Sequence, residues 1–284
     1  MPIKYPEILE LKTSGQTKEW TRQDSMLYAL GLGLAADPLN ERELPFVYEK
    51  DQKAMPTIAA ILVRGLGVTV DDLGIDYRLS VHGEQSITWH NPMPPHGRVR
   101  GEGRVISVYD KGEKGAVVNT ETILIDTETD KPLATVRVTS FARGDGNCGA
   151  PREGAPPPHT MPDRTPDKVS SIATRPDQAL LYRLSGDHNP LHADPAAAKS
   201  AGFERPILHG LCTYGLAART ILETYGDYRP EILKELRARF SAPVYPGDTI
   251  TFDFWKSGTE ISFTAHVKDR NVTVLKNGRA ILTE

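Results

Sequence analysis

The feature that most constrains the fold of this 284-residue chain is an internal repeat. When the sequence is shifted by 150 positions, identical residues coincide in the same order along both halves: Ala29 with Ala179, Leu30 with Leu180, Leu34 with Leu184, Asp37 with Asp187, Pro56 with Pro206, Gly65 with Gly215 and Leu66 with Leu216. Each identity alone is weak evidence. Their collinearity predicts two copies of one fold.

A Gly- and Pro-rich segment separates the two copies. Between Gly144 and Lys168 the apolar periodicity disappears, and three prolines at 156–158 lie at its centre. This composition is typical of a linker, and the chain is long enough for two domains. We therefore expect a first domain at residues 1–145, a linker at 146–168 and a second domain at 169–284.

Each half is expected to contain one helix wrapped by an antiparallel sheet, an α+β architecture. In the second half, apolar residues recur at helical spacing at Ile207, Leu211, Tyr214, Ala218, Ile221 and Tyr225. Alternating apolar residues then predict strands at 250–254 and 261–267, and Asn277–Gly278 is a turn signal before a last short strand. In the first half, the same reasoning predicts a long helix from Ile58, Ala59, Leu62 and Leu66, and a late strand at Val136 and Val138.

Charge and cysteine content exclude several functional classes. The net charge is -3 and the basic residues are scattered, which argues against nucleic acid or an anionic membrane as the main partner. No apolar run approaches the roughly 20 residues needed to span a bilayer. Cys148 and Cys212 have neither metal-site spacing nor a disulfide framework, which fits a soluble protein of a reducing, cytoplasmic compartment.

The segment Tyr182–His192 carries the clearest chemical signal. Its Ser, Gly, Asp, Asn and Pro residues cannot continue a helix, so it is predicted to be a turn. Asp187 and His192 are five residues apart with Pro190 between them, a spacing that can bring a carboxylate and an imidazole onto one water molecule as an acid/base pair. The alternative is that Asp187 and Asn189 only stabilise the turn while His192 caps the next helix.

A second segment, Arg205–Leu211, is predicted to begin the long helix of the second half. Gly210 would present a backbone N–H, free of any Cβ, at the positive end of the helix dipole. Such a donor suits a developing oxyanion. The alternative is that glycine is needed there only for tight helix packing.

Taken together, these motifs resemble the hydratase 2 branch of the MaoC-like hot-dog family, including the hydratase portion of peroxisomal multifunctional enzyme type 2. The resemblance covers nearly the whole chain. The segments that carry it are Tyr182–His192, Gly202–Cys212, Ala238–Phe240 and Pro243–Gly247 in the second half, and His82–Gln85 and Asp110–Gly112 in the first.

The resemblance implies a double hot-dog fold and a hydro-lyase of fatty-acid metabolism. The implied reaction is reversible hydration of trans-2-enoyl-CoA to (3R)-3-hydroxyacyl-CoA, without a cofactor. Asp187 and His192 would be the catalytic dyad, Asn189 would position them and the water, and the Gly210 N–H would hold the thioester oxygen.

The resemblance also implies a set of contacts with the acyl-CoA substrate: His82, Gly83, Lys111, Asp187, His188, Asn189, Pro190, Leu191, His192, Gly210 and Phe240. Within this set, His188 is expected to face solvent or to play a supporting role. A homodimer is expected, in the cytoplasm or, for a eukaryotic source, in the peroxisome, although Ile281–Glu284 is not an SKL-type signal.

The first copy is expected to lack the dyad. It keeps Asp37 opposite Asp187, but it reads Asp37–Asn40 as DPLN and has no histidine before His82. By resemblance, this degenerate copy accommodates the acyl chain.

Four other interpretations remain open. His188 and His192, with Asp187 and Asp194, have a spacing compatible with a metal site, although Pro190 disfavours a shared helix face. A hot-dog thioesterase would use a carboxylate to attack the thioester carbonyl. A non-catalytic acyl-binding module would need no dyad. A hydrolase built on Ser185 is disfavoured, because no nucleophile-elbow pattern surrounds that serine.

Overall fold

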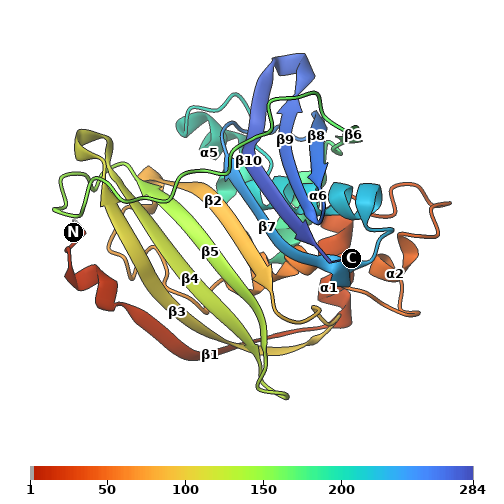
Figure 1. The fold of residues 1–284 in the computed structure, drawn as a ribbon, viewed down its shortest axis with the longest axis horizontal. Helices are drawn as coiled ribbons and strands as arrows, with labels where there is room; N and C mark the ends of the chain where they lie inside the picture. The colour runs from red at the N-terminus through yellow and green to blue at the C-terminus, as the bar shows by residue number, and fades with distance from the viewer. Residues whose placement is uncertain (1–2, 284) are drawn as a thin grey trace.

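The computed structural model describes residues 3–283 and forms one ten-stranded antiparallel sheet (Figure 1). The strands of the first half are β1 (Lys12–Trp20), β2 (Ser80–Trp89), β3 (Gly97–Asp110), β4 (Ala116–Asp126) and β5 (Pro132–Ala142). Those of the second half are β6 (Lys168–Ala173), β7 (Leu233–Phe240), β8 (Thr249–Ser257), β9 (Glu260–Val267) and β10 (Val272–Leu282).

The strand order confirms that the chain contains two copies of one fold. Across the sheet the order is β1-β3-β4-β5-β2-β7-β10-β9-β8-β6. Counted inward from each edge, the first strand of a half is followed by its third, fourth and fifth, and its second strand lies at the centre. The two halves therefore have the same topology and are related by an approximate twofold axis between β2 and β7.

The two halves join through the pairing of β2 with β7. Residues 84–88 of β2 pair antiparallel with residues 239–235 of β7. Within this ladder Ile87 lies opposite Leu236, and both side chains are fully buried. Because buried apolar contacts and backbone hydrogen bonds both cross this boundary, the halves share one sheet and one core.

The long helix α6 (Gly210–Tyr225) covers the sheet of the second half (Figure 1). Its side chains are buried on nearly all faces, because it packs against β6 and β7 on one side and against the first half on the other. A Cβ on Gly215 would lie 2.5 Å from Cδ2 of Leu32, so glycine lets the first half pack closely against α6 at this crossing. The helix begins at Gly210, three residues later than the apolar periodicity suggested.

The remaining helices are short. The α-helices are α1 (Arg22–Gly31), α2 (Leu44–Val47), α3 (Ala59–Leu62), α4 (Gln178–Tyr182) and α5 (Pro195–Ser200). Single turns of 3-10 helix occur at η1 (Glu7–Glu10), η2 (Pro56–Ile58), η3 (Tyr77–Leu79), η4 (Gly112–Lys114), η5 (Arg183–Ser185), η6 (Pro190–His192), η7 (Pro230–Ile232) and η8 (Lys268–Arg270). None of the helices within residues 3–283 is long and apolar enough to cross a lipid bilayer.

The prediction of a long helix in the first half was wrong. Where α6 has its counterpart, the chain forms only η2 and the four residues of α3. The chain continues in turns after Leu62, and Gly65 has φ +82°, a left-handed conformation that does not fit a helix through this position. A Cβ on Gly67 would lie 2.0 Å from Oγ1 of Thr122, so the chain after α3 runs directly against the sheet.

The predicted turn at Asn277–Gly278 is instead a bulge within β10. The strand is continuous from Val272 to Leu282, and its register against β7 shifts between Lys276 and Arg279. Asn277 has φ +52°, and a Cβ on Gly278 would lie 2.6 Å from the Phe263 ring. Asn-Gly supports left-handed conformations in bulges as well as in hairpin turns, so the dipeptide alone does not separate the two.

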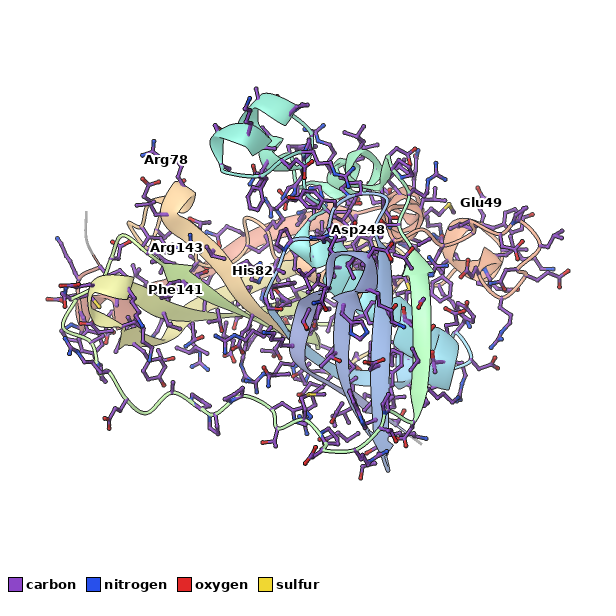
Figure 2. All side chains as sticks on the ribbon, turned by 90° about the horizontal axis from the view of Figure 1, so that it is seen from above. Glu49, Arg78, His82, Phe141, Arg143 and Asp248 are labelled. Atoms are coloured by element: carbon purple, nitrogen blue, oxygen red, sulfur yellow. The ribbon has the colours of Figure 1, made fainter. Side chains whose placement is uncertain are left out.

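The segment between the halves, residues 143–167, contains no helix or strand. Its later part lies along the second half of the sheet, where His159 Nε2 is 2.7 Å from Ser262 Oγ and Asn277 Nδ2 donates to the His159 carbonyl at 2.9 Å. Figure 2 shows it spanning the length of the molecule between the two halves.

Candidate active site

The segment that was predicted to be a turn, Tyr182–His192, leaves α4 through η5 and reverses at Gly186, whose φ of +115° is in the left-handed region. Asn189 Oδ1 accepts a hydrogen bond of 3.0 Å from the Leu191 N–H, and Asp187 Oδ1 accepts one of 3.4 Å from the Asn189 N–H. Both residues therefore stabilise the turn, as one alternative held. That alternative was wrong about His192, because Asp194 caps α5 instead.

His192 is held in one orientation and one tautomer. Its ring is buried, and Nδ1 lies 2.8 Å from the Ile207 carbonyl oxygen. A carbonyl can only accept, so Nδ1 carries the proton and Nε2 of the neutral ring is free to accept one. Burial, together with the Arg64 cation, lowers the pKa of His192. The ring is thus a neutral base near pH 7.

Asp187 and His192 meet although five residues separate them. A carboxylate oxygen of Asp187 and one ring nitrogen each of His192 and His209 lie within 4.8 Å of one another. The Asp187 side chain is 13% exposed, so the cluster is accessible while most of it is buried. A water molecule in contact with this group would face a carboxylate and an imidazole at once.

His209 is a member of the cluster that our sequence reasoning missed. It is the residue before α6, it is almost fully buried, and its ring stacks on His192 with centroids 3.7 Å apart. Its Nε2 donates to the Asp187 carbonyl at 3.1 Å, so it also holds the turn. Burial and the neighbouring His192 lower the pKa of His209 to about 4. The only sequence signal was its position beside Gly210.

Gly210 and Phe240 lie together at the start of α6. Gly210 is the first helical residue, is exposed, and would place a Cβ 3.3 Å from the Phe240 ring. The backbone N–H groups of a first helical turn have no partner within the helix. This end of α6 can therefore present N–H donors to a bound oxygen atom beside the Asp187, His192 and His209 cluster.

His82 reaches the same region from the first half. It lies on β2 near the junction of the two halves (Figure 2), and its ring packs edge-on against Phe240 with centroids 4.9 Å apart. Its Nε2 is buried and has no hydrogen-bond partner among the described residues. Burial lowers the pKa of His82 to about 4, and Asp187 and Arg64 are close enough to contribute. Gly83 follows, facing the Thr139 carbonyl.

Other residues expected in the site lie at or near the surface. Lys111 is exposed in the turn between β3 and β4, where its Nζ lies 3.3 Å from the Arg152 carbonyl. His188 and Pro190 are exposed and Leu191 is half-buried. His188 thus faces solvent, one of the two positions expected for it.

Arg64 is a second site residue that our sequence reasoning missed. It follows α3 in the first half, and its Nη1 lies 3.1 Å from Asp187 Oδ2. Its partner is 123 residues away in the sequence, and nothing in the local pattern around Arg64 distinguishes it from any surface arginine.

The Asp187, His192 and His209 atoms are also close enough to be considered for a metal ion. Two features disfavour one. The Arg64 guanidinium already holds the Asp187 carboxylate, and the nearly parallel rings of His192 and His209, tilted by 27°, do not direct their lone pairs to one point. His188, on which the metal interpretation rested, is not part of this group.

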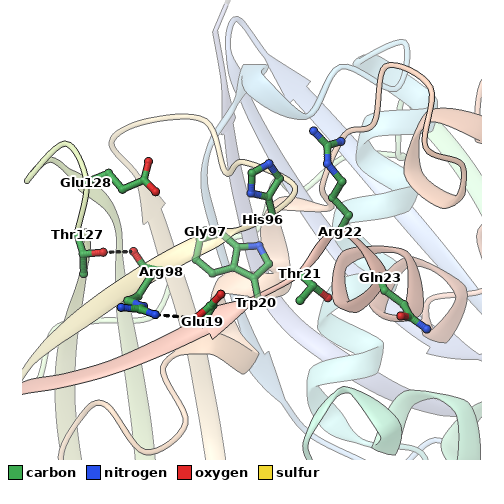
Figure 3. A pocket seen from close by; sticks show the side chains of 10 residues that line it. All are labelled: Glu19, Trp20, Thr21, Arg22, Gln23, His96, Gly97, Arg98, Thr127 and Glu128. Atoms are coloured by element: carbon green, nitrogen blue, oxygen red, sulfur yellow. Dashed lines mark hydrogen bonds and ion pairs between the residues drawn. The ribbon is translucent and has the colours of Figure 1, made fainter.

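A separate surface pocket lies in the first half, away from this cluster (Figure 3). Its walls come from the end of β1, the start of α1 and the start of β3, and one side carries the ion pair of Arg98 with Glu19 at 2.8 Å. It contains none of the residues expected in the site.

Comparison with known proteins places this chain in a family. Residues 158–277 match the MaoC like domain, and residues 19–144 match the MFE-2 hydratase 2 N-terminal domain. The chain is 38% identical to an enoyl-CoA hydratase of Mycobacterium tuberculosis over 98% of both chains. The chain belongs to the MaoC-like hydratase 2 family. The resemblance seen in the sequence motifs is thereby confirmed.

Solved structures share the fold. The MaoC-like dehydratase from Phytophthora capsici superposes with a TM-score of 0.87 at 32% identity, covering 99% of both chains. A Mycobacterium tuberculosis protein with a double hotdog fold superposes with a TM-score of 0.52 at 14% identity, covering 96% of both chains, which shows the fold alone. The double hot-dog prediction is confirmed.

The buried histidines make acid stability a testable property of this MaoC-like chain. His82 and His209 have folded-state pKa values of about 4, below the 6.5 of an unfolded histidine. Between these values the unfolded chain binds more protons, so the free energy of unfolding should fall as the pH is lowered from about 6.5 to about 4. The loss should be on the order of a few kcal/mol for the two histidines together.

Urea unfolding at pH 7, 5.5 and 4.5 measures this loss. In His82→Gln and His209→Gln, which each lack one of the two rings, the free energy of unfolding should fall less over this range. A free energy of unfolding that is constant from pH 7 to pH 4.5 would contradict neutral burial of these rings.

Proposed function

We propose that this protein catalyses the reversible hydration of trans-2-enoyl-CoA to (3R)-3-hydroxyacyl-CoA. One observation carries the proposal: Asp187 and His192 converge beside the start of α6, in a chain whose relatives over its full length include a named enoyl-CoA hydratase. A Mycobacterium tuberculosis relative named 3-hydroxyacyl-thioester dehydratase, 37% identical over 89% of this chain, corresponds to the reverse direction.

In this mechanism, Asp187 and His192 act on one water molecule. Asp187 offers its carboxylate oxygens and His192 offers Nε2, and the pair accepts a proton from the water as the water oxygen bonds to C3. The electron pair of the double bond moves toward the thioester oxygen, where the Gly210 N–H stabilises the developing charge. The dyad then returns a proton to C2, and Asn189 holds the turn that aligns the pair.

The substrate contacts are proposed from the same set of residues. His82 and Phe240 would line the site next to the dyad, and their mutual packing supports this. Gly83 and the exposed Lys111 would contact the CoA portion, which carries negative charge. The single turn of α3, in place of a long helix, supports the first half as the part that accommodates the acyl chain.

We also propose domain boundaries at 145/146 and 168/169, supported by the lack of helix and strand in residues 143–167. A homodimer in solution is proposed as well, and light scattering of the purified protein tests it.

The decisive experiment follows loss of the ultraviolet absorbance of the enoyl thioester with substrates from crotonyl-CoA to decenoyl-CoA. Chiral chromatography of the product should show the 3R alcohol. Release of free thiol from an acyl-CoA would instead indicate a thioesterase. Binding without turnover of any chain length would indicate a non-catalytic acyl-binding module.

Replacing Asp37, the repeat counterpart of Asp187, should have little effect. Asp37 is exposed and its Oδ1 accepts a local hydrogen bond of 2.9 Å from the Leu39 N–H. Asp37→Asn is therefore expected to change the hydration rate by less than about twofold, the scale of a surface substitution. The same assay on Asp187→Asn is the comparison. Equal losses in the two variants would show that chemistry is not confined to the second half.

A further inference from the structure

We propose that Arg64, from the degenerate first half, is a positioning residue of the active site that holds the Asp187 carboxylate in place for hydration. The inference rests on the proposed function, because it assigns Arg64 a role in that reaction. In this proposal, both halves of the chain contribute residues to the catalytic site.

The first step of the argument is the contact itself. Arg64 Nη1 lies 3.1 Å from Asp187 Oδ2, while Oδ1 of the same carboxylate faces the Asn189 N–H at 3.4 Å. The two oxygens are thus oriented by different groups. A carboxylate with a hydrogen-bond donor at each oxygen is held in one orientation toward the water that it shares with His192.

The second step is that Arg64 itself is fixed. Its backbone N–H donates to the Ile61 carbonyl at 3.2 Å, and Gly65 then turns the chain away. Lys18 Nζ, from β1, donates to the Ile61 carbonyl at 3.0 Å and to the Arg64 carbonyl at 3.5 Å. Burial and the nearby Arg64 lower the pKa of Lys18, as expected for two cations held close together.

The third step concerns the charge that Arg64 brings. An ion pair whose arginine is 44% exposed contributes little to stability, so fold stability alone is a poor reason for this contact. The charged and titratable groups around His192 are Asp187 on its own turn, His209 before α6 and Arg64 after α3. Asp187 raises the pKa of His192, whereas burial, the largest effect, and the Arg64 cation lower it.

The fourth step is the asymmetry of the repeat. The counterpart of Arg64 in the second half is Tyr214, which is buried in α6 and donates to the Leu236 carbonyl at 2.6 Å. The second half therefore has no equivalent cation at this position. A half that has lost its own dyad contributes a charged side chain to the dyad of the other.

The test compares Arg64→Gln and Arg64→Lys with the control Arg42→Gln. Arg42 also forms an ion pair from the first half to the second, with Asp227, but it lies outside the cluster. In Arg64→Gln, kcat should fall by roughly tenfold to a hundredfold with a smaller change in KM, since a misplaced reacting group costs about this much. Arg64→Lys should recover part of the loss, and Arg42→Gln should match the parent protein.

Two further measurements separate positioning from a merely structural effect. Without the Arg64 cation, His192 binds a proton more readily, so the acid limb of the kcat/KM profile should move to higher pH. NMR titration of the His192 ring, assigned with His192→Gln, should show the same upward shift without requiring turnover.

The outcomes are distinguishable from failure of the proposed function. If the parent protein hydrates no enoyl-CoA, the proposed function and the positioning role fail together, while the NMR titration still reports whether Arg64 acts on His192. If the parent is active and Arg64→Gln retains its kcat, the positioning role is overturned, whatever the titration shows. Equal melting temperatures of Arg64→Gln and Arg42→Gln would exclude unfolding as the cause of a loss.

Discussion

Asp187→Asn and His192→Ala are each expected to reduce turnover of an enoyl-CoA by about a hundredfold or more, the usual cost of losing a general acid or base. Asp187→Asn removes the carboxylate and leaves the turn in place, because the amide oxygen can still accept from the Asn189 N–H. His192→Ala removes the imidazole ring, whose tautomer is fixed by the hydrogen bond from Nδ1 to the Ile207 carbonyl. Steady-state kinetics with crotonyl-CoA measure both.

The double variant tests whether the two groups act as a unit. Because both contact one water molecule, the combined loss should be far smaller than the product of the single losses. Asp37→Asn is the matched control, since this exposed carboxylate at the equivalent position of the first half forms a local hydrogen bond with the Leu39 N–H. Fully multiplicative losses would argue against a shared water.

The architecture could be predicted because identical residues occupy equivalent positions in the two halves and favour the same local structure in each. Collinear identities such as Pro56 with Pro206 mark equivalent positions in two halves of the same topology, and the strand order confirms this. What the repeat does not encode is divergence after duplication. Gly215 lies within α6, whereas its repeat counterpart Gly65 has φ +82° and lies in the turn after α3, so one aligned pair adopts two different local structures.

The candidate site was predictable where its residues are neighbours in the sequence. Asp187, Asn189 and His192 share one turn, whose composition excludes a helix and draws them together. His209 and Arg64 reach the cluster from other elements, through ring stacking on His192 and an ion pair across the two halves. Such contacts depend on how α6 and α3 pack, and no local pattern reports packing between distant elements.

The isolated second half, residues 168–284, is expected to self-associate and to lose at least about tenfold in hydration rate per folded fragment. Cutting the chain there removes β2, so β7 becomes an exposed edge strand, and it uncovers α6 where Leu32 packs on Gly215. The fragment also loses Arg64 and His82, two of the groups that reach the dyad from the first half.

Self-association should use the exposed edge of β7. Because β2 and β7 are repeat equivalents at the centre of the sheet, a second copy of β7 has the length and direction to take the place of β2. Light scattering gives the mass of the fragment, and hydration of crotonyl-CoA and decenoyl-CoA gives its rate and chain-length preference. If the first half accommodates the acyl chain, the longer substrate should suffer more.

Adding back the first half is the control. Co-expression of residues 1–167 should restore a one-to-one complex with the β2–β7 ladder, Arg64 and the parent rate, since every lost contact is supplied by that piece. A monomeric second half with the parent rate and an unchanged chain-length profile would show that the first half contributes neither a site residue nor space for the acyl chain. In that case, the ion pair of Arg64 with Asp187 would be a contact without catalytic consequence.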